Sequence, residues 1–354
     1  MQNRLFFFLL LSVACKAQQP VIKGNDSHIH YMGRITMQNE VAELSWSGNS
    51  ASINFDGTGV KATLKDQKGE NTYNVIVDGK VMNTIRPDTT TKEYTLVSGL
   101  PAGKHYLELF KRTEWVMGKT WLHQLRIDGS ILDAPGTKKR KIEFYGNSIT
   151  CGYAIEDTTG QDRGTAPYEN GYRSYAAITA RHFDAEFSSV SRSGIGVVIS
   201  WFPLIMPELY DRQDPDNPGS KWDFSRYTPD VVVINLFQND SWLVLKPEHE
   251  QFKARFGAKA PSADYIVTAY RNFVKSIREK YPDATIICAL GTMDASKKGS
   301  PWFGYIEKAV AGLNDKKILT HNLGFKSTPG HPSGPEQESM AKDLIGFIEK
   351  NIKW

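Results

Sequence analysis

The pattern of apolar residues changes near residue 140, and this change limits the fold more than any other feature of the chain. From residue 41 to about 128, short strand-like segments are separated by Gly, Asn and Asp, which is typical of an all-β unit. From residue 141 onward, apolar strand segments alternate with helical ones. Such alternation predicts a parallel sheet with helices on both faces. The chain of 354 residues is therefore predicted to form two domains of different classes.

The bounds of these domains follow from the same pattern. We predict a β-sandwich or jelly roll over residues 20–130, a linker with Gly, Pro and charged residues over 131–140, and an α/β domain over 141–354. Within the β domain, Asp78-Gly79 predicts a tight hairpin, because both residues tolerate a positive φ. Within the α/β domain, strands are predicted at 141–146, 230–237, 284–291 and 317–322, and helices near 172–183, 263–280, 302–313 and 335–350.

The first 17 residues have the composition of an export signal. Arg4 precedes an apolar run from Leu5 to Ala14, which is too short to span a membrane. Cleavage after Ala17 would release a free protein, whereas "LSVAC" resembles a bacterial lipoprotein signal that ends at residue 14 and makes Cys15 a candidate lipid attachment site. The chain is therefore predicted to be exported, either as a periplasmic or extracellular protein or as an outer-membrane lipoprotein.

Charge and composition exclude several classes of function. The formal net charge of the whole chain is +4 and its only basic run is "KKRK" at 138–141, so nucleic acid is not expected as a partner. No CxxC pair is present, and His28 and His30, which would share one face of a strand, are interpreted as surface or packing residues. We therefore expect no metal and no organic cofactor. No feature of the sequence specifies an oligomeric state.

A serine follows directly after the first predicted strand of the α/β domain, in the segment "EFYGNSITCGY". Ligands of parallel α/β sheets bind beyond the carboxyl ends of the strands, which is where Ser148 lies. A serine acts as a nucleophile only with a general base and with donors for the oxyanion. Glycine plus serine after a strand is by itself more often a turn or a helix cap.

The wider pattern is more specific. "GNSIT", "SRSGIG", "QND" and "GHPSGPEQESMA" all fall at loop positions of the alternating scheme. This set resembles the SGNH hydrolases, or GDSL-type esterases, over residues 141–354. Together with "HYMGRI", "GVKATL" and "VDG" in the β domain, it resembles carbohydrate esterase family two. That resemblance implies a jelly roll joined to a flavodoxin-like, three-layer SGNH domain. It also implies an acetyl xylan esterase type of activity, which deacetylates xylan or mannan, often at primary hydroxyls.

The resemblance also implies roles for individual residues. Ser148 would be the nucleophile and His331 its base. The backbone N–H groups of Ser148 and Gly194 and the side-chain amide of Asn239 would form the oxyanion hole. Glycine suits position 194 because it has no Cβ to block the approach of the ester oxygen. Cys151, which closely follows the serine, is interpreted as a buried small residue rather than as a nucleophile.

Two positions depart from the family pattern. Phe237 replaces the usual glycine of the third block, and we consider it and Trp242 as candidates for substrate contact or for packing. The positions before His331 hold no carboxylate, since they read Thr-Pro-Gly. The hypothesis is a Ser-His dyad in which a backbone carbonyl holds the imidazole, with Asp294 as the rival orienting group.

The function predicted from these residues is a serine carbohydrate esterase that removes O-acetyl groups from xylan-type or mannan-type polysaccharide, or from its oligosaccharides, through an acyl-enzyme. Two alternatives remain at this point. One is a lipase or thioesterase of the same fold, which would need an apolar acyl groove. The other is a carbohydrate-binding protein with decayed catalytic machinery, which the missing carboxylate and Phe237 would favour.

Overall fold

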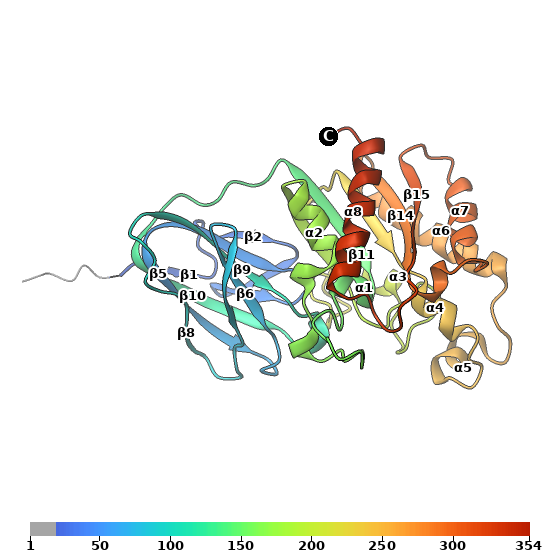
Figure 1. Ribbon diagram of the computed structural model, residues 1–354, viewed down its shortest axis with the longest axis horizontal. Coiled ribbons are helices and arrows are strands. Elements are labelled where there is room, and N and C mark those ends of the chain that lie inside the picture. Colours follow the sequence, from blue (N-terminus) through green and yellow to red (C-terminus); the bar gives the residue numbers. More distant parts are fainter. Residues whose placement is uncertain (1–18) are drawn as a thin grey trace, which may run out of the picture.

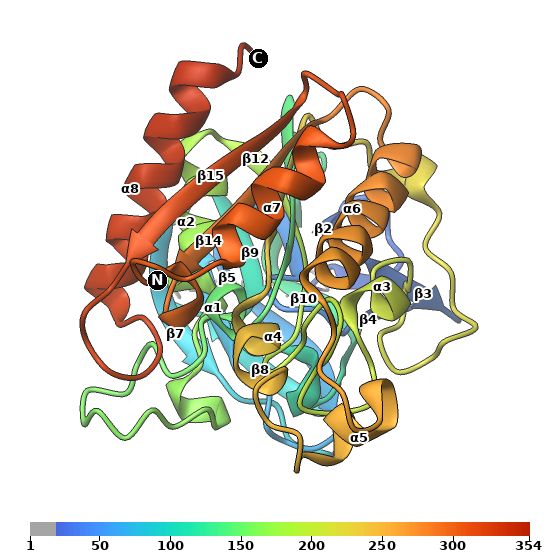
Figure 2. The same ribbon diagram turned by 90° about the vertical axis from the view of Figure 1, so that its right-hand side faces the viewer.

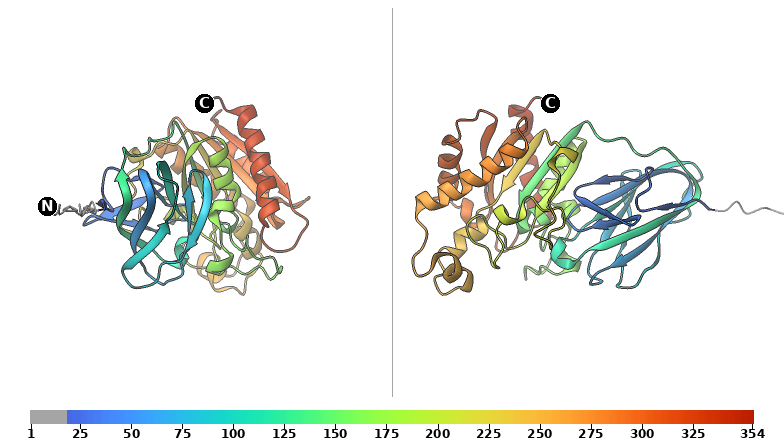
Figure 3. Two further views of the ribbon diagram at one scale, coloured as in Figure 1. Left: turned by 60° about the vertical axis from the view of Figure 1, so that its left-hand side comes forward. Right: turned by 180° about the vertical axis from the view of Figure 1, so that it is seen from behind.

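Two domains lie side by side, an all-β domain and an α/β domain (Figure 1). The computed structural model describes residues 19–354, so the predicted export signal and Cys15 lie outside the described residues. Among residues 19–354, no helix is both long enough and apolar enough to cross a membrane. Residues 132–139 connect the last strand of the β domain to the first strand of the α/β domain, along the outside of both (Figures 1 and 3).

The β domain is antiparallel throughout. Its strands are β1 (Val21–Lys23), β2 (His30–Met32), β3 (Ile35–Gln38), β4 (Val41–Leu44), β5 (Ser50–Asp66), β6 (Tyr73–Val77), β7 (Lys80–Ile85), β8 (Lys92–Val97), β9 (Lys104–Lys111) and β10 (Thr120–Ile131). Their order is β3-β4-β10-β5-β9-β6-β7, and β1 pairs with β10 while β2 and β8 pair with β5. Alternate residues of β5, such as Ile53 and Phe55, are fully buried in the core. The predicted jelly-roll-like domain is confirmed.

The predicted hairpin is present between β6 and β7. Asp78 and Gly79 have φ values of 50° and 79°, so both central residues are left-handed. This is the turn geometry that matches the twist of two antiparallel strands.

The α/β domain contains a five-stranded parallel sheet. Its strands are β11 (Arg140–Gly146), β12 (Ala185–Ser191), β13 (Val231–Asn235), β14 (Thr285–Thr292) and β15 (Ile318–Phe325). The order β12-β11-β13-β14-β15 is that of flavodoxin-like folds, as predicted. The edge strand β12 received no bounds from the sequence, because Ser188, Ser189 and Ser191 interrupt its apolar run.

Helices cover both faces of this sheet. The longer ones are α2 (Tyr175–His182), α6 (Ala263–Lys280), α7 (Trp302–Ala311) and α8 (Gly334–Asn351), close to the predicted ranges. Neighbouring strand residues face opposite helix layers: Phe144 packs in the cluster with α2 and α8, and Tyr145 in the cluster with α6 and α7. Figure 2 shows α8 on one side of β15 and α6 with α7 on the other. The alternation in the sequence thus encodes a three-layer domain.

Arg34 joins the two domains. It lies between β2 and β3 and is 2% exposed. Its Nη2 donates to Glu143 Oε1 at 3.1 Å and to the Tyr145 hydroxyl at 3.1 Å. Its Nη1 donates to the carbonyls of Tyr210 and Arg212 at 2.6 and 2.8 Å. The guanidinium of Arg34 is therefore one of the groups that dock the β domain on the α/β domain.

Candidate active site

Ser148 begins the short helix α1 (Ser148–Cys151), directly after β11. Asn147 caps this helix, because its side-chain oxygen accepts the N–H of Ile149 at 3.1 Å. Gly146 is required by space, since a Cβ there would lie 2.0 Å from Thr150 Oγ1. The segment Gly146-Asn147-Ser148 thus folds into a tight strand-to-helix turn that places the serine at the carboxyl edge of the sheet.

His331 lies beside this serine. It comes from the loop before α8, and its Nε2 is 2.8 Å from Ser148 Oγ. Its Nδ1 is 2.9 Å from both carboxylate oxygens of Asp162, and its backbone N–H also donates to Asp162 Oδ1 at 2.8 Å. Because a carboxylate only accepts, Nδ1 carries the hydrogen and Nε2 is free to accept the serine proton.

Asp162 corrects the hypothesis of a dyad held by a backbone carbonyl. Asp294 is not the orienting group either, because its Oδ2 accepts the indole N–H of Trp242 at 2.9 Å. Burial alone would raise the pKa of Asp162, but the hydrogen bonds and the charge of His331 outweigh burial and hold that pKa below its ordinary value. Asp162 is therefore a carboxylate at neutral pH, suited to stabilise an imidazolium.

The loop that carries Asp162 runs between α1 and α2 and is braced internally. Asp162 has a φ of 57°, in the left-handed region. Arg163 donates from Nε and Nη2 to the two oxygens of Asp157 at 3.0 and 2.8 Å, and its guanidinium lies 3.9 Å from the ring centre of Tyr168. Sequence reasoning missed Asp162, because it is 169 residues from His331 and lies in an irregular loop with more than one aspartate.

Gly194 occupies a turn beside Ser148. The N–H of Ile195 donates to the carbonyl of Arg192 at 3.3 Å, and Gly194, the third residue of this turn, has a φ of 82°. That φ is the reason for a glycine at this position. Within the described part of the chain, no acceptor is bonded to the backbone N–H of Ser148 or of Gly194. Both N–H groups are therefore available to a ligand.

Asn239 lies on α4 (Gln238–Leu243), after β13. Its Oδ1 accepts the indole N–H of Trp201 at 3.0 Å, and its Nδ2 donates to the carbonyl of Ile195 at 2.8 Å. A side-chain amide has two N–H groups, so one remains for an oxyanion. The bonds to Trp201 and Ile195 fix the orientation of this amide next to the Gly194 turn.

Asp240 anchors the backbone that follows the turn. Its carboxylate accepts the N–H groups of Val197, Val198 and Ile199, at 2.9, 2.7 and 3.2 Å. Burial raises the pKa of Asp240 to about 6, against the lowering effect of these bonds. Gly196 is needed for this packing, since a Cβ there would lie 2.5 Å from Asp240 Oδ2.

These groups surround one cavity of about 470 Å³, which Ser148, Asp162, Gly194, Asn239 and His331 all line. Aromatic side chains form much of the remaining wall: Tyr153, Trp201, Phe202 and Trp242. The Tyr153 ring packs on the His331 ring at 4.3 Å between centroids. The cavity thus combines a serine, a base and free N–H donors with flat apolar surfaces.

Of the two candidates for substrate contact, Trp242 lines the cavity and Phe237 does not. Phe237 is 0% exposed and packs against Tyr270 and Trp302, with ring centroids 4.6 and 5.0 Å away. Of the two roles considered for Phe237, the structure therefore supports packing and not substrate contact. Its φ of 82° turns the side chain into the core, and this backbone conformation explains why glycine is usual there.

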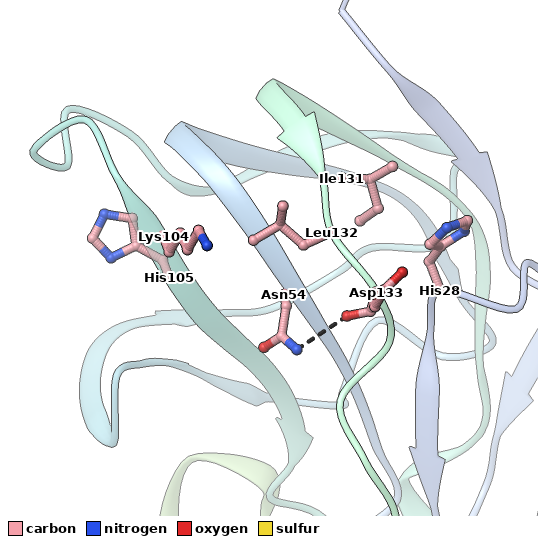
Figure 4. A pocket seen from close by; sticks show the side chains of 7 residues that line it. All are labelled: His28, Asn54, Lys104, His105, Ile131, Leu132 and Asp133. Atoms are coloured by element: carbon pink, nitrogen blue, oxygen red, sulfur yellow. Dashed lines mark hydrogen bonds between the residues drawn. The ribbon is translucent and has the colours of Figure 1, made fainter.

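A more voluminous hollow, of about 540 Å³, lies on the β domain (Figure 4). Three of its polar side chains are already paired: His28 with Asp26, His105 with Asp78, and Asn54 with the carbonyl of Asp133. It contains no nucleophile beside a base. Among the described residues, no three His, Cys, Asp or Glu side chains are grouped as a metal site would require.

Comparisons with known proteins agree with this architecture. Residues 31–135 match the family model described as carbohydrate esterase 2 N-terminal, and residues 144–317 match the GDSL-like lipase/acylhydrolase family. The cellulase/esterase CelE of Acetivibrio thermocellus is 36% identical over an alignment of 326 residues, which covers 88% of this chain and 38% of that protein. An acetylxylan esterase/glucomannan deacetylase of Cellvibrio japonicus is 28% identical over 345 residues, covering 94% of this chain and 91% of that protein.

Solved structures give the same result. A family two carbohydrate esterase from Clostridium thermocellum, in complex with cellohexaose, is 35% identical and has a TM-score of 0.81, covering 91% of this chain and 98% of that chain. One from Cellvibrio japonicus is 25% identical and has a TM-score of 0.83, covering 94% and 98%. Both family models match in the expected order, and the 35% identity to the Clostridium thermocellum esterase extends over 98% of that chain. The chain therefore belongs to carbohydrate esterase family two, and so to the carboxylic ester hydrolases.

Proposed function

We propose that this protein removes O-acetyl groups from plant cell-wall polysaccharide of the xylan or mannan type, or from its oligosaccharides. One observation carries the proposal: the bonded series Asp162, His331, Ser148 lies beside two backbone N–H groups without acceptors. The family membership and the relatives described as acetylxylan esterases and glucomannan deacetylases support it.

The reaction follows from the geometry. His331 Nε2 takes the Ser148 proton as Oγ attacks the acetyl carbonyl carbon. The oxyanion that forms accepts hydrogen bonds from the N–H groups of Ser148 and Gly194 and from the Asn239 amide, and one such donor is typically worth about 2.7–4 kcal/mol. The imidazolium then protonates the departing sugar oxygen. A water molecule, deprotonated by His331, hydrolyses the acetyl-enzyme to acetate.

The cavity wall favours a sugar ester over a long acyl chain. Trp201 is 40% exposed and Trp242 is half-buried, so both present ring surface on which sugar rings stack. Polar groups such as Arg192 and Ser193 line the same cavity, whereas an acyl groove would be apolar along its length. The bonded triad also argues against the alternative of a decayed binding protein.

Release of acetate tests the proposal. Wild type and Ser148→Ala are compared on acetylated xylan, acetylated glucomannan and 4-nitrophenyl acetate. We expect acetate from wild type only, since Ser148→Ala lacks the nucleophile. Binding to the polysaccharides without release of acetate would instead support the decayed-enzyme alternative. Faster hydrolysis of long-chain esters than of acetyl esters would support a lipase.

We further propose that the protein is exported and that residues 1–17 are its signal. The support is the basic residue Arg4 followed by the apolar run to Ala14. Mass spectrometry of the mature N-terminus decides between two outcomes. A chain that begins at Gln18 is released freely, whereas a lipid-modified Cys15, lost in Cys15→Ala, marks a membrane-anchored lipoprotein.

A further inference from the structure

A buried carboxylate of the β domain reaches the candidate active site. Glu114 follows β9 and precedes the short 3-10 helix η1 (Trp115–Met117). It is 2% exposed, yet it lines the catalytic cavity. Its Oε2 accepts the backbone N–H of Ser193 at 2.8 Å and the weaker S–H of Cys151 at 3.8 Å. None of the reaction steps above uses this side chain.

Ser193 is the second residue of the turn that carries Gly194. The bond from Glu114 therefore fixes the peptide immediately before the Gly194 N–H. On the other side of the turn, Asp240 holds the N–H groups of Val197 to Ile199. Gly194 thus lies between two carboxylate anchors, and each anchor comes from a different domain.

Glu169 keeps this arrangement from carrying two negative charges. It is 0% exposed, and its Oε2 accepts the backbone N–H of Glu114 at 3.1 Å. Burial, together with the nearby charge of Glu114, raises the pKa of Glu169 well above its ordinary value, so Glu169 holds a proton. Lys111 supplies the positive charge nearby, where its Nζ donates to the carbonyls of Thr113 and Glu114 at 2.8 and 3.3 Å.

We propose that Glu114 is a positioning residue through which the β domain completes the oxyanion hole. This inference rests on the proposed esterase reaction. Oxyanion donors act by being fixed before the reaction begins, and Glu114 fixes the peptide that aims the Gly194 N–H. Without it, the Ser193 N–H loses this acceptor and the turn is free to shift.

The expected kinetic signature follows from where Glu114 acts. Its carboxylate is bonded to the turn, so we expect it to act through Gly194, which bonds the oxyanion more strongly than the ground-state carbonyl. Loss of Glu114 should therefore lower kcat and leave KM nearly unchanged. If Glu114 had only a structural role, its loss would lower the melting temperature but would not lower kcat selectively over KM.

The test compares four variants on 4-nitrophenyl acetate, with melting temperatures measured for each. We expect Glu114→Ala to lower kcat by about 10- to 100-fold, with KM within about two-fold, because misplacement by about 1 Å costs rates of this order. Glu114→Gln should keep kcat within about five-fold, since its amide oxygen still accepts the Ser193 N–H. Glu169→Gln mimics the neutral acid and should stay within about two-fold of wild type.

Cys151→Ala is the matched control, because it removes the other contact of Glu114 Oε2 and leaves the bond to Ser193. Its kcat should remain within about two-fold of wild type. A wild-type kcat in folded Glu114→Ala would overturn the inference, and so would an equal loss in Glu114→Gln and Glu114→Ala. If Glu114→Ala does not fold, Glu114→Met, which removes the acceptor and keeps a side chain of similar length, takes its place with the same expected loss of kcat. Wild type without activity on any acetyl ester would instead refute the proposed function.

Discussion

Two of the buried carboxylates where the β domain meets the α/β domain are held in opposite ways. Glu143, on β11, is 0% exposed and accepts hydrogen bonds from Arg34 at 3.1 Å and from the hydroxyls of Tyr145 and Tyr281 at 2.6 and 2.7 Å. Its charge is opposed by a guanidinium in direct contact. Glu114 instead lies against a second carboxyl group, that of Glu169, and points at the active-site turn.

The different surroundings of Glu143 and Glu114 indicate a structural role for the first and a functional role for the second. A buried ion pair docks one domain on another and has no reason to be near the substrate. Two buried carboxyl groups side by side are costly, because one must keep a proton, and such arrangements gather at functional sites. The Arg34 contact therefore holds the domains together, and the Glu114 contact adjusts the site between them. Substitutions at these contacts and elsewhere in the site test this distinction.

The largest effect is expected at Asp162, the carboxylate that acts directly on the base. Asp162→Asn removes the acceptor that holds the Nδ1 hydrogen of His331, so the imidazole loses its productive tautomer. We expect kcat to fall by on the order of 10⁴-fold, as in other triads, with the melting temperature nearly unchanged. Stopped assays with 4-nitrophenyl acetate would measure it.

The matched control for this change is Asp294→Asn. Asp294 bonds Trp242 and not His331, and an asparagine oxygen can still accept the indole N–H. Its kcat should stay within about two-fold of wild type. If Asp294→Asn lost the activity and Asp162→Asn kept it, the assignment of the orienting carboxylate would be reversed.

The second effect concerns stability alone. Arg34→Met leaves Glu143 as a buried charge without its partner, which typically costs about 3–5 kcal/mol in the free energy of unfolding. Because no atom of this contact lines the cavity, kcat of the folded variant should equal that of wild type. Urea denaturation and kinetics on the same samples would check both. A loss of kcat comparable with that of Glu114→Ala would break the comparison between the two contacts.

The sequence predicts the parts of the site that lie at strand ends. Ser148, Gly194, Asn239 and His331 come from four separated segments, and they meet because a parallel sheet brings the carboxyl ends of its strands to one edge. Periodicity places the strand ends and loops, and the resemblance to carbohydrate esterase family two identifies these four residues within them. The same periodicity predicted the helices, whose buried stripes recur every three to four residues.

The parts that the sequence did not predict depend on paths of irregular backbone. Asp162 reaches His331 because a braced loop bends back over the nucleophile, and no local pattern encodes that path. Glu114 lies in a turn of the other domain, so its place in the site follows only from domain docking. Phe237 is next to the active-site segment in sequence, but a left-handed φ turns its ring into the core.

The third effect is a pH dependence at Asp240, a buried carboxylate without a cationic partner among its hydrogen-bond donors. Burial raises its pKa in the folded protein from the ordinary 3.8 to about 6, so the folded state holds this proton more tightly than the unfolded state. The resulting stabilisation is complete below pH 3.8 and is lost as the pH rises through about 6. At about 1.4 kcal/mol per pKa unit, the change approaches about 3 kcal/mol.

Asp240→Asn cannot titrate, so its free energy of unfolding should lack this fall. The difference between wild type and Asp240→Asn, measured in urea from pH 4 to pH 7, isolates the contribution of the one carboxylate. Parallel pH profiles for the two proteins would mean that Asp240 keeps the same charge in both states over this range. In that case burial would not dominate the pKa of Asp240 in the folded protein.

The smallest effect tests whether Phe237 is tolerated only because its ring is buried. Any side chain at a φ of 82° strains the backbone, typically by about 1–2 kcal/mol, and glycine does not. Loss of the ring from between Tyr270 and Trp302 should destabilise the fold by about 3–5 kcal/mol in Phe237→Ala. Phe237→Gly should be more stable than Phe237→Ala by about 1 kcal/mol, the reverse of the usual order within a helix.

Urea denaturation of the two variants measures this difference directly, because both lack the ring and differ only in the methyl group. Both should keep the wild-type KM, since Phe237 does not line the cavity. A more stable alanine variant would mean that the backbone at 237 relaxes out of the left-handed region once the ring is gone. The helix that carries Asn239 and Asp240 would then be held in place by the Phe237 ring. Apolar packing, without a buried charge, would thus position the Asn239 amide of the oxyanion hole.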